Sequence, residues 1–132
     1  MNEVSSARYK PAGHPDISVY LMANDAEAMI AFMTDIFDAS MLMSLAREDG
    51  SIMHAEVRIG DSVVMLSQAT PEYPAFPIWL HVYVPDVDAT YRRAIAHGAE
   101  PVQEPERKGD EDRRGAIKDP AGNIWWIATR EG

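Results

Sequence analysis

The order of predicted secondary-structure elements occurs twice along this chain, and this repetition restricts the fold more than any other feature. A strand, a helix and three further strands are predicted over residues 15–68, and the same order recurs over residues 78–130. An offset of 61 places aligns Asp25 with Asp86. Either a βαβββ module has been duplicated, or an α+β domain has halves that look alike because helices and hairpins use the same capping and turn residues.

Residue spacing predicts each element of the first repeat. Apolar residues alternate over 17–23, which predicts a strand with Tyr20 on the face opposite the aliphatic side chains. Asn24 and Glu27 have the spacing of a capping box, which predicts a helix from about 25 to 37 with Asn24 as its N-cap. Three strands are expected after the helix, over 41–46, 51–59 and 62–68.

The second repeat begins with a strand over 78–84, whose aliphatic residues occupy one face. The side chains on its other face are Trp79, His81 and Tyr83. Asp86 is expected to cap a helix over about 87–97. In the last strand the same alternation places Trp126 on the face of Trp79, and Trp125 beneath the helix.

Three segments lack the periodicity of helices or strands. Residues 1–16 are predicted to form a loose arm. Residues 70–77 contain three prolines and are predicted to be a linker. The charged stretch 106–114 is predicted to be a solvated loop that ends in two arginines, one of them Arg114.

The composition excludes several classes of function. The chain has 132 residues and no cysteine, which excludes disulfides, thiolate metal sites and thiol redox chemistry. Its net charge of −9 opposes binding to nucleic acids and to anionic lipid surfaces. No apolar run is long enough to span a bilayer, and the first residues lack the pattern of a secretory signal. We therefore expect a cytoplasmic protein that binds neither nucleic acid nor membrane.

Four segments carry a family resemblance: YLMANDAEAMIAFMTDIF, HAEVRIGDSVVMLSQ, VYVPDVDATYRRAIAHGAE and RRGAIKDPAGNIWWIATR. They resemble the vicinal oxygen chelate superfamily, which includes glyoxalase I, bleomycin resistance proteins, fosfomycin-modifying enzymes and extradiol dioxygenases, and they look closest to its PhnB-like branch. The resemblance implies a single domain over 1–132, of class α+β. Paired βαβββ modules over about 15–68 and 78–130, joined by the linker 70–77, would form a cupped mixed sheet with helices on its convex face.

The same resemblance implies where a metal site would lie. In the metal enzymes of the superfamily, the first ligand, usually His, corresponds to Ser18 of this chain. The His of the second module corresponds to Trp79, and the closing Glu to Trp126. The remaining carboxylate falls within residues 63–66, none of which is acidic. Because such sites use imidazole nitrogen and carboxylate oxygen, we expect no metal and no other cofactor.

The strand faces predict an aromatic cup that would suit a flat or aromatic ligand, because each ring offers a large apolar face and a polar edge. The candidate ligand-binding residues are Trp79, His81, Tyr83, Trp126, Tyr20, His54 and Arg114. The aromatic residues of this set could instead fill the cup themselves or pack against a partner subunit.

Three hypotheses for function follow. The first is a metal-free protein that binds an apolar or aromatic small molecule in a cleft completed by a homodimer, for sequestration or resistance. The second is an enzyme of the superfamily, a lyase, isomerase or dioxygenase, with non-standard metal ligands or acid–base catalysis by His54 or His81. His54, Glu56 and His81 would supply two imidazoles and a carboxylate if the strands brought them together. The third is a structural or regulatory dimer whose aromatic face is an interface.

Overall fold

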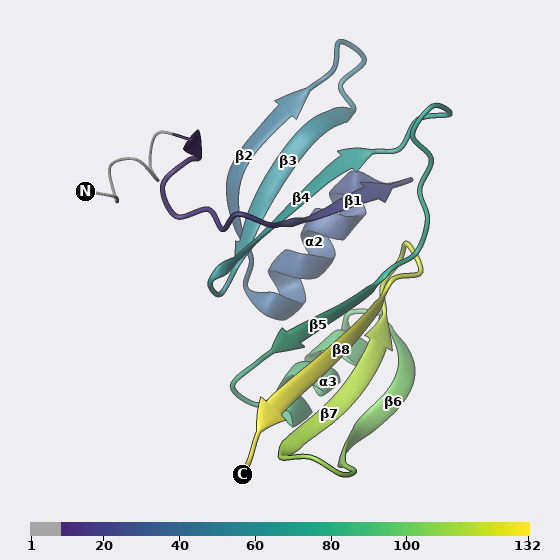
Figure 1. Ribbon diagram of the computed structural model, residues 1–132. Coiled ribbons are helices and arrows are strands. Elements are labelled where there is room, and N and C mark those ends of the chain that lie inside the picture. Colours follow the sequence, from purple (N-terminus) through teal and green to yellow (C-terminus); the bar gives the residue numbers. More distant parts are fainter. Residues whose placement is uncertain (1–8) are drawn as a thin grey trace, which may run out of the picture.

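Residues 9–132, which the computed structural model describes, form two four-stranded sheets, each packed against one helix (Figure 1). The elements of the first module are β1 (Val19–Ala23), α2 (Ala26–Phe37), β2 (Ser40–Ala46), β3 (Ile52–Ile59) and β4 (Ser62–Gln68). The elements of the second module are β5 (Trp79–Tyr83), α3 (Val87–Ala96), β6 (Glu100–Arg107), β7 (Asp112–Lys118) and β8 (Ile124–Arg130).

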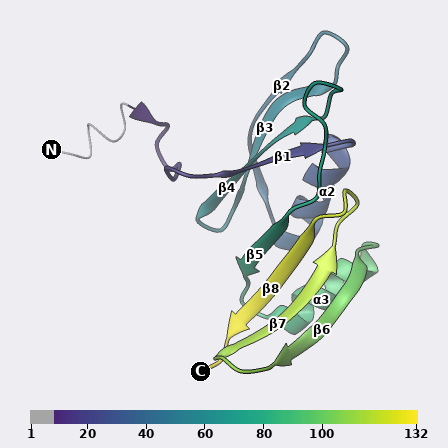
Figure 2. The ribbon, with the colours of Figure 1, turned by 45° about the vertical axis from the view of Figure 1, so that its right-hand side comes forward.

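Both sheets are mixed and have the same topology. Their strand orders are β1-β4-β3-β2 and β5-β8-β7-β6, and in each the first strand of the module runs parallel to the last. The two helices contact each other, and both lie behind the sheets in Figures 1 and 2. The predicted α+β fold of paired βαβββ modules is confirmed. Neither helix in residues 9–132 is long and apolar enough to cross a bilayer.

Helix α2 is capped one residue later than the sequence predicted. Its N-cap is Asp25, whose Oδ1 accepts a hydrogen bond from the backbone N–H of Ala28 at 3.0 Å. The backbone carbonyl of Asn24 instead accepts a hydrogen bond from the side-chain amide of Gln68. The prediction of Asn24 as N-cap is therefore wrong. The adjacent aspartate is an equally suitable cap, and its negative charge also favours the helix N-terminus.

The hydrophobic core continues from one module into the other. Trp125 in β8 is 2% exposed, and its ring centroid lies 5.9 Å from that of Phe32 and 4.9 Å from that of Phe37. Both phenylalanines belong to α2 of the first module. Trp125 is therefore buried, as its place in the strand predicted, and its aromatic partners come from the helix of the other module.

Asp119 organises the turn that leads into β8. Its Oδ1 accepts hydrogen bonds from the backbone N–H groups of Ala121 and Asn123 at 2.8 and 3.0 Å. Its Oδ2 accepts from the Asn123 amide at 3.0 Å and from Trp125 Nε1 at 2.8 Å. Asn123 Oδ1 accepts from the N–H of Ile78 at 2.8 Å. The turn therefore fixes the position of Trp125 and connects β8 to the start of β5.

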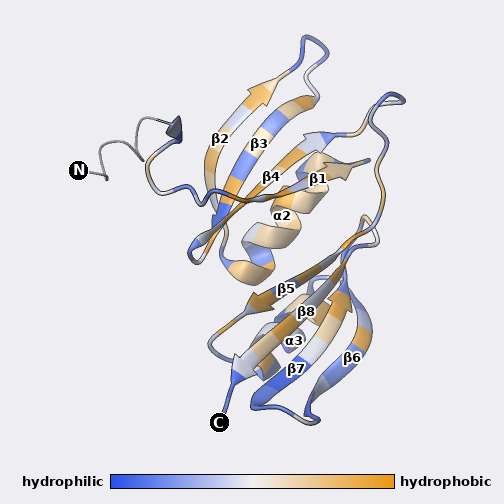
Figure 3. Cartoon of the chain, viewed as in Figure 1, coloured by the Kyte–Doolittle hydropathy of each residue, from blue (hydrophilic) through white to orange (hydrophobic). Residues whose placement is uncertain are grey.

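The charged loop between β6 and β7 is shorter than predicted. Because β6 continues to Arg107 and β7 begins at Asp112, Arg113 and Arg114 lie on a strand instead of in a loop. Arg113 Nε donates to Asp88 of α3 at 3.1 Å, so Arg113 faces the helix. Figure 3 shows that β6 and this turn are mainly hydrophilic. The prediction of a solvated loop is therefore correct only for the residues between the two strands.

Candidate functional site

The titratable side chains of the first sheet all lie on the face opposite α2. In β1 to β4 they are Tyr20, His54, Glu56 and Arg58. Tyr20 pairs with Met65 across β1 and β4, and Met65 pairs with Glu56 across β4 and β3. Paired residues share a face, and alternate residues of one strand do so too. We call this surface, together with Ser67, the first-module face.

A chain of hydrogen bonds crosses the first-module face. Tyr20 Oη lies 2.8 Å from Ser67 Oγ and 3.0 Å from His54 Nδ1. His54 Nε2 in turn lies 2.8 Å from Glu56 Oε2. Tyr20 is 48% exposed, whereas Glu56 is 8% exposed. A partly exposed hydroxyl is thus connected to a buried carboxylate through an imidazole, an arrangement suited to proton transfer.

The segment before β1 docks on the same face. His14 Nε2 lies 2.7 Å from Glu56 Oε1, and Arg58 Nη1 donates to the carbonyl of Gly13 at 3.1 Å. Gly13 has a φ of +82°, and a Cβ there would lie 3.1 Å from the Arg58 guanidinium. The prediction of a loose arm is therefore wrong for Gly13 and His14, because these contacts attach them to β3. Residues 1–8 lie outside the described part of the chain.

Glu56 is the charged centre of this network. Hydrogen bonds from His14 and then from His54 hold the pKa of its carboxyl below the ordinary value. Bonds from two N–H donors favour the ionised form of a carboxyl group. Glu56 therefore acts as an acceptor toward both imidazoles.

The helix-free face of the second sheet carries the predicted aromatic side chains. Trp79 and Tyr83 are 71% and 63% exposed. The Trp79 ring lies 5.4 Å from that of Trp126, and His81 pairs with Trp126 across β5 and β8. The structure thus brings Trp79, His81, Tyr83 and Trp126 together, and with Arg114 we call them the second-module face. Because Trp79 and Tyr83 are exposed, they do not fill the core of their own chain.

Arg114 is held on this face by hydrogen bonds to His81 and Asp112. Its Nε donates to His81 Nε2 at 3.1 Å, and its Nη2 donates to Asp112 at 2.8 Å. Tyr83 Oη donates to the same carboxylate at 2.7 Å, and this bond raises the pKa of the Tyr83 hydroxyl. The pKa of His81 is lowered, first by desolvation of its imidazole and then by the charge of Arg114. His81 is therefore a neutral acceptor in this network.

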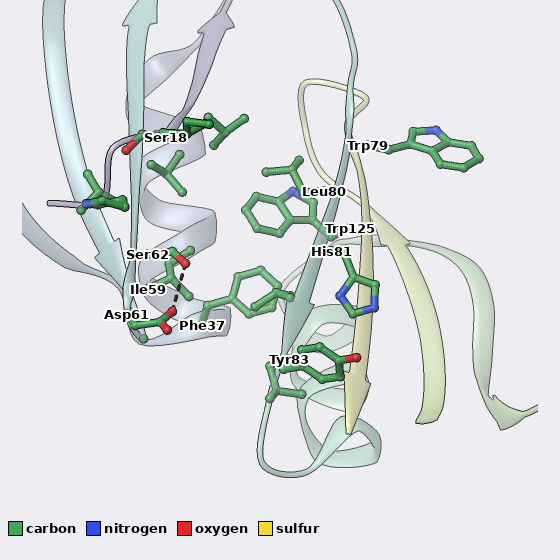
Figure 4. Close-up of a pocket in the computed structure, with 18 of the residues that line it drawn as sticks. Ser18, Phe37, Ile59, Asp61, Ser62, Trp79, Leu80, His81, Tyr83 and Trp125 are labelled. Carbon is green, nitrogen blue, oxygen red and sulfur yellow. Dashed lines mark hydrogen bonds between the residues drawn. The ribbon is translucent and has the colours of Figure 1, made fainter. Parts of the chain in front are cut away.

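A groove of about 740 Å³ lies between the two modules, beside β5. Figure 4 shows Phe37, Leu80 and Trp125 pointing into it, whereas Trp79 extends from the other side of β5. The groove therefore shares Trp79, His81 and Tyr83 with the aromatic surface predicted from the sequence, and its other wall comes from the first module. The sequence does not predict it, because it depends on how the two modules are placed relative to each other.

The metal site considered from the sequence is not assembled within one chain. His54 and Glu56 are hydrogen-bonded to each other in the first module, whereas His81 lies in the second and is bonded to Arg114. Within residues 9–132, no group of three or more His, Cys, Asp or Glu side chains is arranged to hold a metal ion. The ligand set His54, Glu56 and His81 is therefore wrong for a single chain.

Comparison with known sequences places the chain in a family. The profile of the Glyoxalase/Bleomycin resistance protein/Dioxygenase superfamily matches residues 14–127. An uncharacterized protein of Mycobacterium bovis is 34% identical over 122 residues, which cover 84% of this chain and 80% of the relative. A protein of Mycobacterium tuberculosis is 34% identical over 122 residues, which cover 84% of this chain and 72% of the relative. The chain belongs to this superfamily.

Solved structures share the fold. TioX from Micromonospora sp. ML1 has a TM-score of 0.76 and 24% identity, covering 88% of this chain and 98% of its own. TnmS3, an antibiotic binding protein from Streptomyces sp. CB03234, has a TM-score of 0.69 and 22% identity. The match covers 89% of this chain and 100% of TnmS3. The fosfomycin resistance protein FosX from Listeria monocytogenes has a TM-score of 0.64 and 19% identity. The match covers 87% of this chain and 92% of FosX.

Proposed function

We propose that the protein binds an apolar or aromatic small molecule against the second-module face, in a cleft that a second copy completes. The observation that carries this proposal is the exposure of Trp79 and Tyr83 beside Trp126 on one face of a sheet. Large aromatic side chains grouped on an exposed surface are typical of binding sites. The description of the similarly folded TnmS3 as an antibiotic binding protein supports the same kind of function.

The indole N–H of Trp126 adds a polar contact for such a ligand. Trp126 Nε1 is shielded from solvent and has no hydrogen-bond partner among the described residues. A shielded donor without an acceptor costs free energy. A ligand with an acceptor atom at this position would remove that cost and would be oriented by the bond.

The homodimer is supported by apolar side chains that the single chain leaves exposed. Those on β2 and β3 are Met41, Leu42, Leu45 and Met53. β2 and β5 are also edge strands of their sheets. Exposed edges and apolar surface favour association with a symmetric partner. If the first-module face of one copy lay over the second-module face of the other, the two would enclose a ligand.

The metal-free state belongs to the same proposal. It is supported by Ser18, Trp79 and Trp126 at the ligand positions implied by the superfamily, since none of them is an imidazole or a carboxylate. We also assign the chain to the PhnB-like branch, on its motifs, and to the cytoplasm, on its cysteine-free composition.

A second candidate function is acid–base catalysis on a molecule bound against the first-module face. It is supported by the distances that link the Tyr20 hydroxyl to His54 and His54 to Glu56, which are within the range for proton transfer. A bound metal is not required for this chemistry.

Three measurements test the proposal. Titration with a planar aromatic dye should quench tryptophan fluorescence to saturation, and light scattering should give the mass of a dimer. Elemental analysis after dialysis should find no stoichiometric divalent metal. A monomer at micromolar concentration, or no saturable quenching, would contradict binding in a dimer-completed cleft. Near-unit nickel, zinc, iron or manganese would favour an enzyme instead.

A further inference from the structure

The protons of the Tyr20 network can be assigned by counting donors. Ser67 Oγ lies 2.7 Å from the carbonyl of Met53, and only the hydroxyl can donate in that bond. The single Ser67 proton is therefore committed. In the contact of 2.8 Å between Tyr20 Oη and Ser67 Oγ, Tyr20 must then be the donor.

The same reasoning applies to the imidazole of His54. If the Tyr20 proton is directed to Ser67, the contact of 3.0 Å between Tyr20 Oη and His54 Nδ1 requires a proton on Nδ1. The contact of 2.8 Å between His54 Nε2 and the Glu56 carboxylate requires a proton on Nε2. All these bonds form together only when both ring nitrogens carry protons. When His54 Nδ1 carries no proton, the Tyr20 hydroxyl donates to Nδ1. The contact between Tyr20 Oη and Ser67 Oγ is then no longer a hydrogen bond. The network can therefore take up one proton.

Several charged and titratable groups lie around His54 on this face. The buried carboxylate of Glu56 lies on one side of the ring. The other titratable groups on this face are Tyr20, Arg58 and His14 from the segment before β1. Arg58 donates to a backbone carbonyl, and His14 shares the Glu56 carboxylate. Glu56 is therefore the anionic hydrogen-bond partner of His54 on this face.

We propose that the first-module face binds the ionised oxygen of a hydroxyaromatic or enolic ligand at Tyr20, and that His54 stores the proton the ligand loses. This inference rests on the proposed function, because it specifies the polar end of the same bound molecule. In the step, the ligand O–H bond breaks and its proton moves to Tyr20 Oη. The Tyr20 O–H bond breaks and that proton moves to His54 Nδ1. The ligand oxygen then accepts from the new Tyr20 O–H, and no atom or electron is left over.

The Tyr20 hydroxyl is accessible to a ligand. It is 48% exposed, whereas the groups behind it become progressively more buried toward Glu56. When the Tyr20 proton points to the ligand instead of to Ser67, only an acceptor lone pair on Ser67 loses its partner. An unfilled acceptor costs less than an unpaired donor. The hydroxyl can therefore bind a ligand oxygen without leaving a buried donor unpaired.

The test compares two probes that differ by one methyl group. 4-Nitrophenol can ionise and changes its visible absorption when it does, whereas 4-nitroanisole cannot. We expect the wild-type dimer to bind both probes. Bound 4-nitrophenol should take up its proton at a pH about one unit lower than the free probe does. Tyr20→Phe should remove this shift and weaken 4-nitrophenol binding about tenfold. Binding of 4-nitroanisole by the same variant should be unchanged, which also shows that it folds.

Tyr73→Phe is the matched control, because Tyr73 is an exposed tyrosine in the linker. It should behave as the wild type toward both probes. The inference is overturned if Tyr20→Phe ionises 4-nitrophenol as the wild type does, or if the wild type binds 4-nitrophenol only as the neutral phenol. In either case, binding of 4-nitroanisole would still support the proposed function. If the wild type binds neither probe, both proposals are overturned.

Discussion

The two modules share a backbone plan but differ in the chemistry of their helix-free faces. Tyr20 pairs with Met65 in the first sheet, and His81 pairs with Trp126 at the corresponding register of the second. The first-module face leads inward to the buried carboxylate of Glu56, whereas the second-module face presents exposed rings. The comparison shows that a repeated module fixes strand direction and register. Individual side chains then decide what each face can bind.

The largest effect is expected at Trp125, where the two modules meet. Trp125→Ala should lower the free energy of unfolding by about 3–5 kcal/mol, because it removes a fully buried ring and leaves a cavity against α2. Denaturant unfolding followed by circular dichroism measures the loss. A loss below about 1 kcal/mol would contradict the view that the modules share this contact.

The turn of the second module should have the next largest effect. Asp119→Ala removes the acceptor of Trp125 Nε1 and of the Asn123 side chain, and should lower the free energy of unfolding by about 3 kcal/mol. Asp119→Asn is the control, because it keeps one acceptor oxygen and should lose less. Equal losses for the two variants, measured by denaturant unfolding, would show that the one acceptor oxygen kept by Asp119→Asn contributes little to stability.

On the second-module face the expected effect is on binding. Trp126→Ala should weaken binding of a planar dye about tenfold, or ~1.4 kcal/mol, because it removes a ring and the unpaired indole N–H. Its unfolding free energy should fall much less than that of Trp125→Ala, since Trp126 is only partly buried. If Trp126→Ala loses as much stability as Trp125→Ala and binds the dye normally, the face is packed core or an interface.

The smallest effect is expected in the pH dependence of stability, and it distinguishes the two faces. The pKa of Glu56 is lowered from 4.5 in the folded protein. The unfolded state therefore binds more protons in acid, so the stabilisation by Glu56 is present above pH 4.5 and is lost as the pH falls through the folded pKa. Glu56→Gln should cost about 1 kcal/mol at pH 7, and the difference from wild type should shrink below that window.

His81 determines the pH range in which the second-module face affects stability. Its pKa is lowered from 6.5, so the unfolded state takes up its proton first and stability falls as the pH drops below 6.5. His81→Gln should remove that part of the pH dependence and leave the window of Glu56 unchanged. Thermal midpoints from about pH 2 to 8 cover both pH ranges, and a single range shared by both variants would contradict the separation of the two faces.

Local patterns together with the family resemblance predicted the fold, and local patterns alone predicted part of the candidate site. Alternation over 78–84 predicted that Trp79 and Tyr83 share a face away from the core, because strand parity depends only on neighbouring residues. The same parity separated Trp125 from Trp126. The N-cap of α2 was misplaced by one residue, because Asn24 and Asp25 are both good caps and spacing alone does not choose between them.

Contacts between distant segments were not predictable from the sequence. His14 lies 42 residues from Glu56, in a segment without periodicity, so nothing local indicates that its ring meets that carboxylate. The groove beside β5 and the contact of Trp125 with α2 depend on how one module sits against the other. Strand patterns describe each module by itself and carry no information about that placement.

The contact of Trp125 with Phe32 and Phe37 also determines how the molecule should unfold. Each half contributes rings to one shared cluster, so the loss of either half would expose aromatic surface of the other to water. Unfolding should therefore be a single cooperative transition, with no state in which one module is folded and the other is not. We therefore expect the two structural halves of the repeat to behave as one thermodynamic unit.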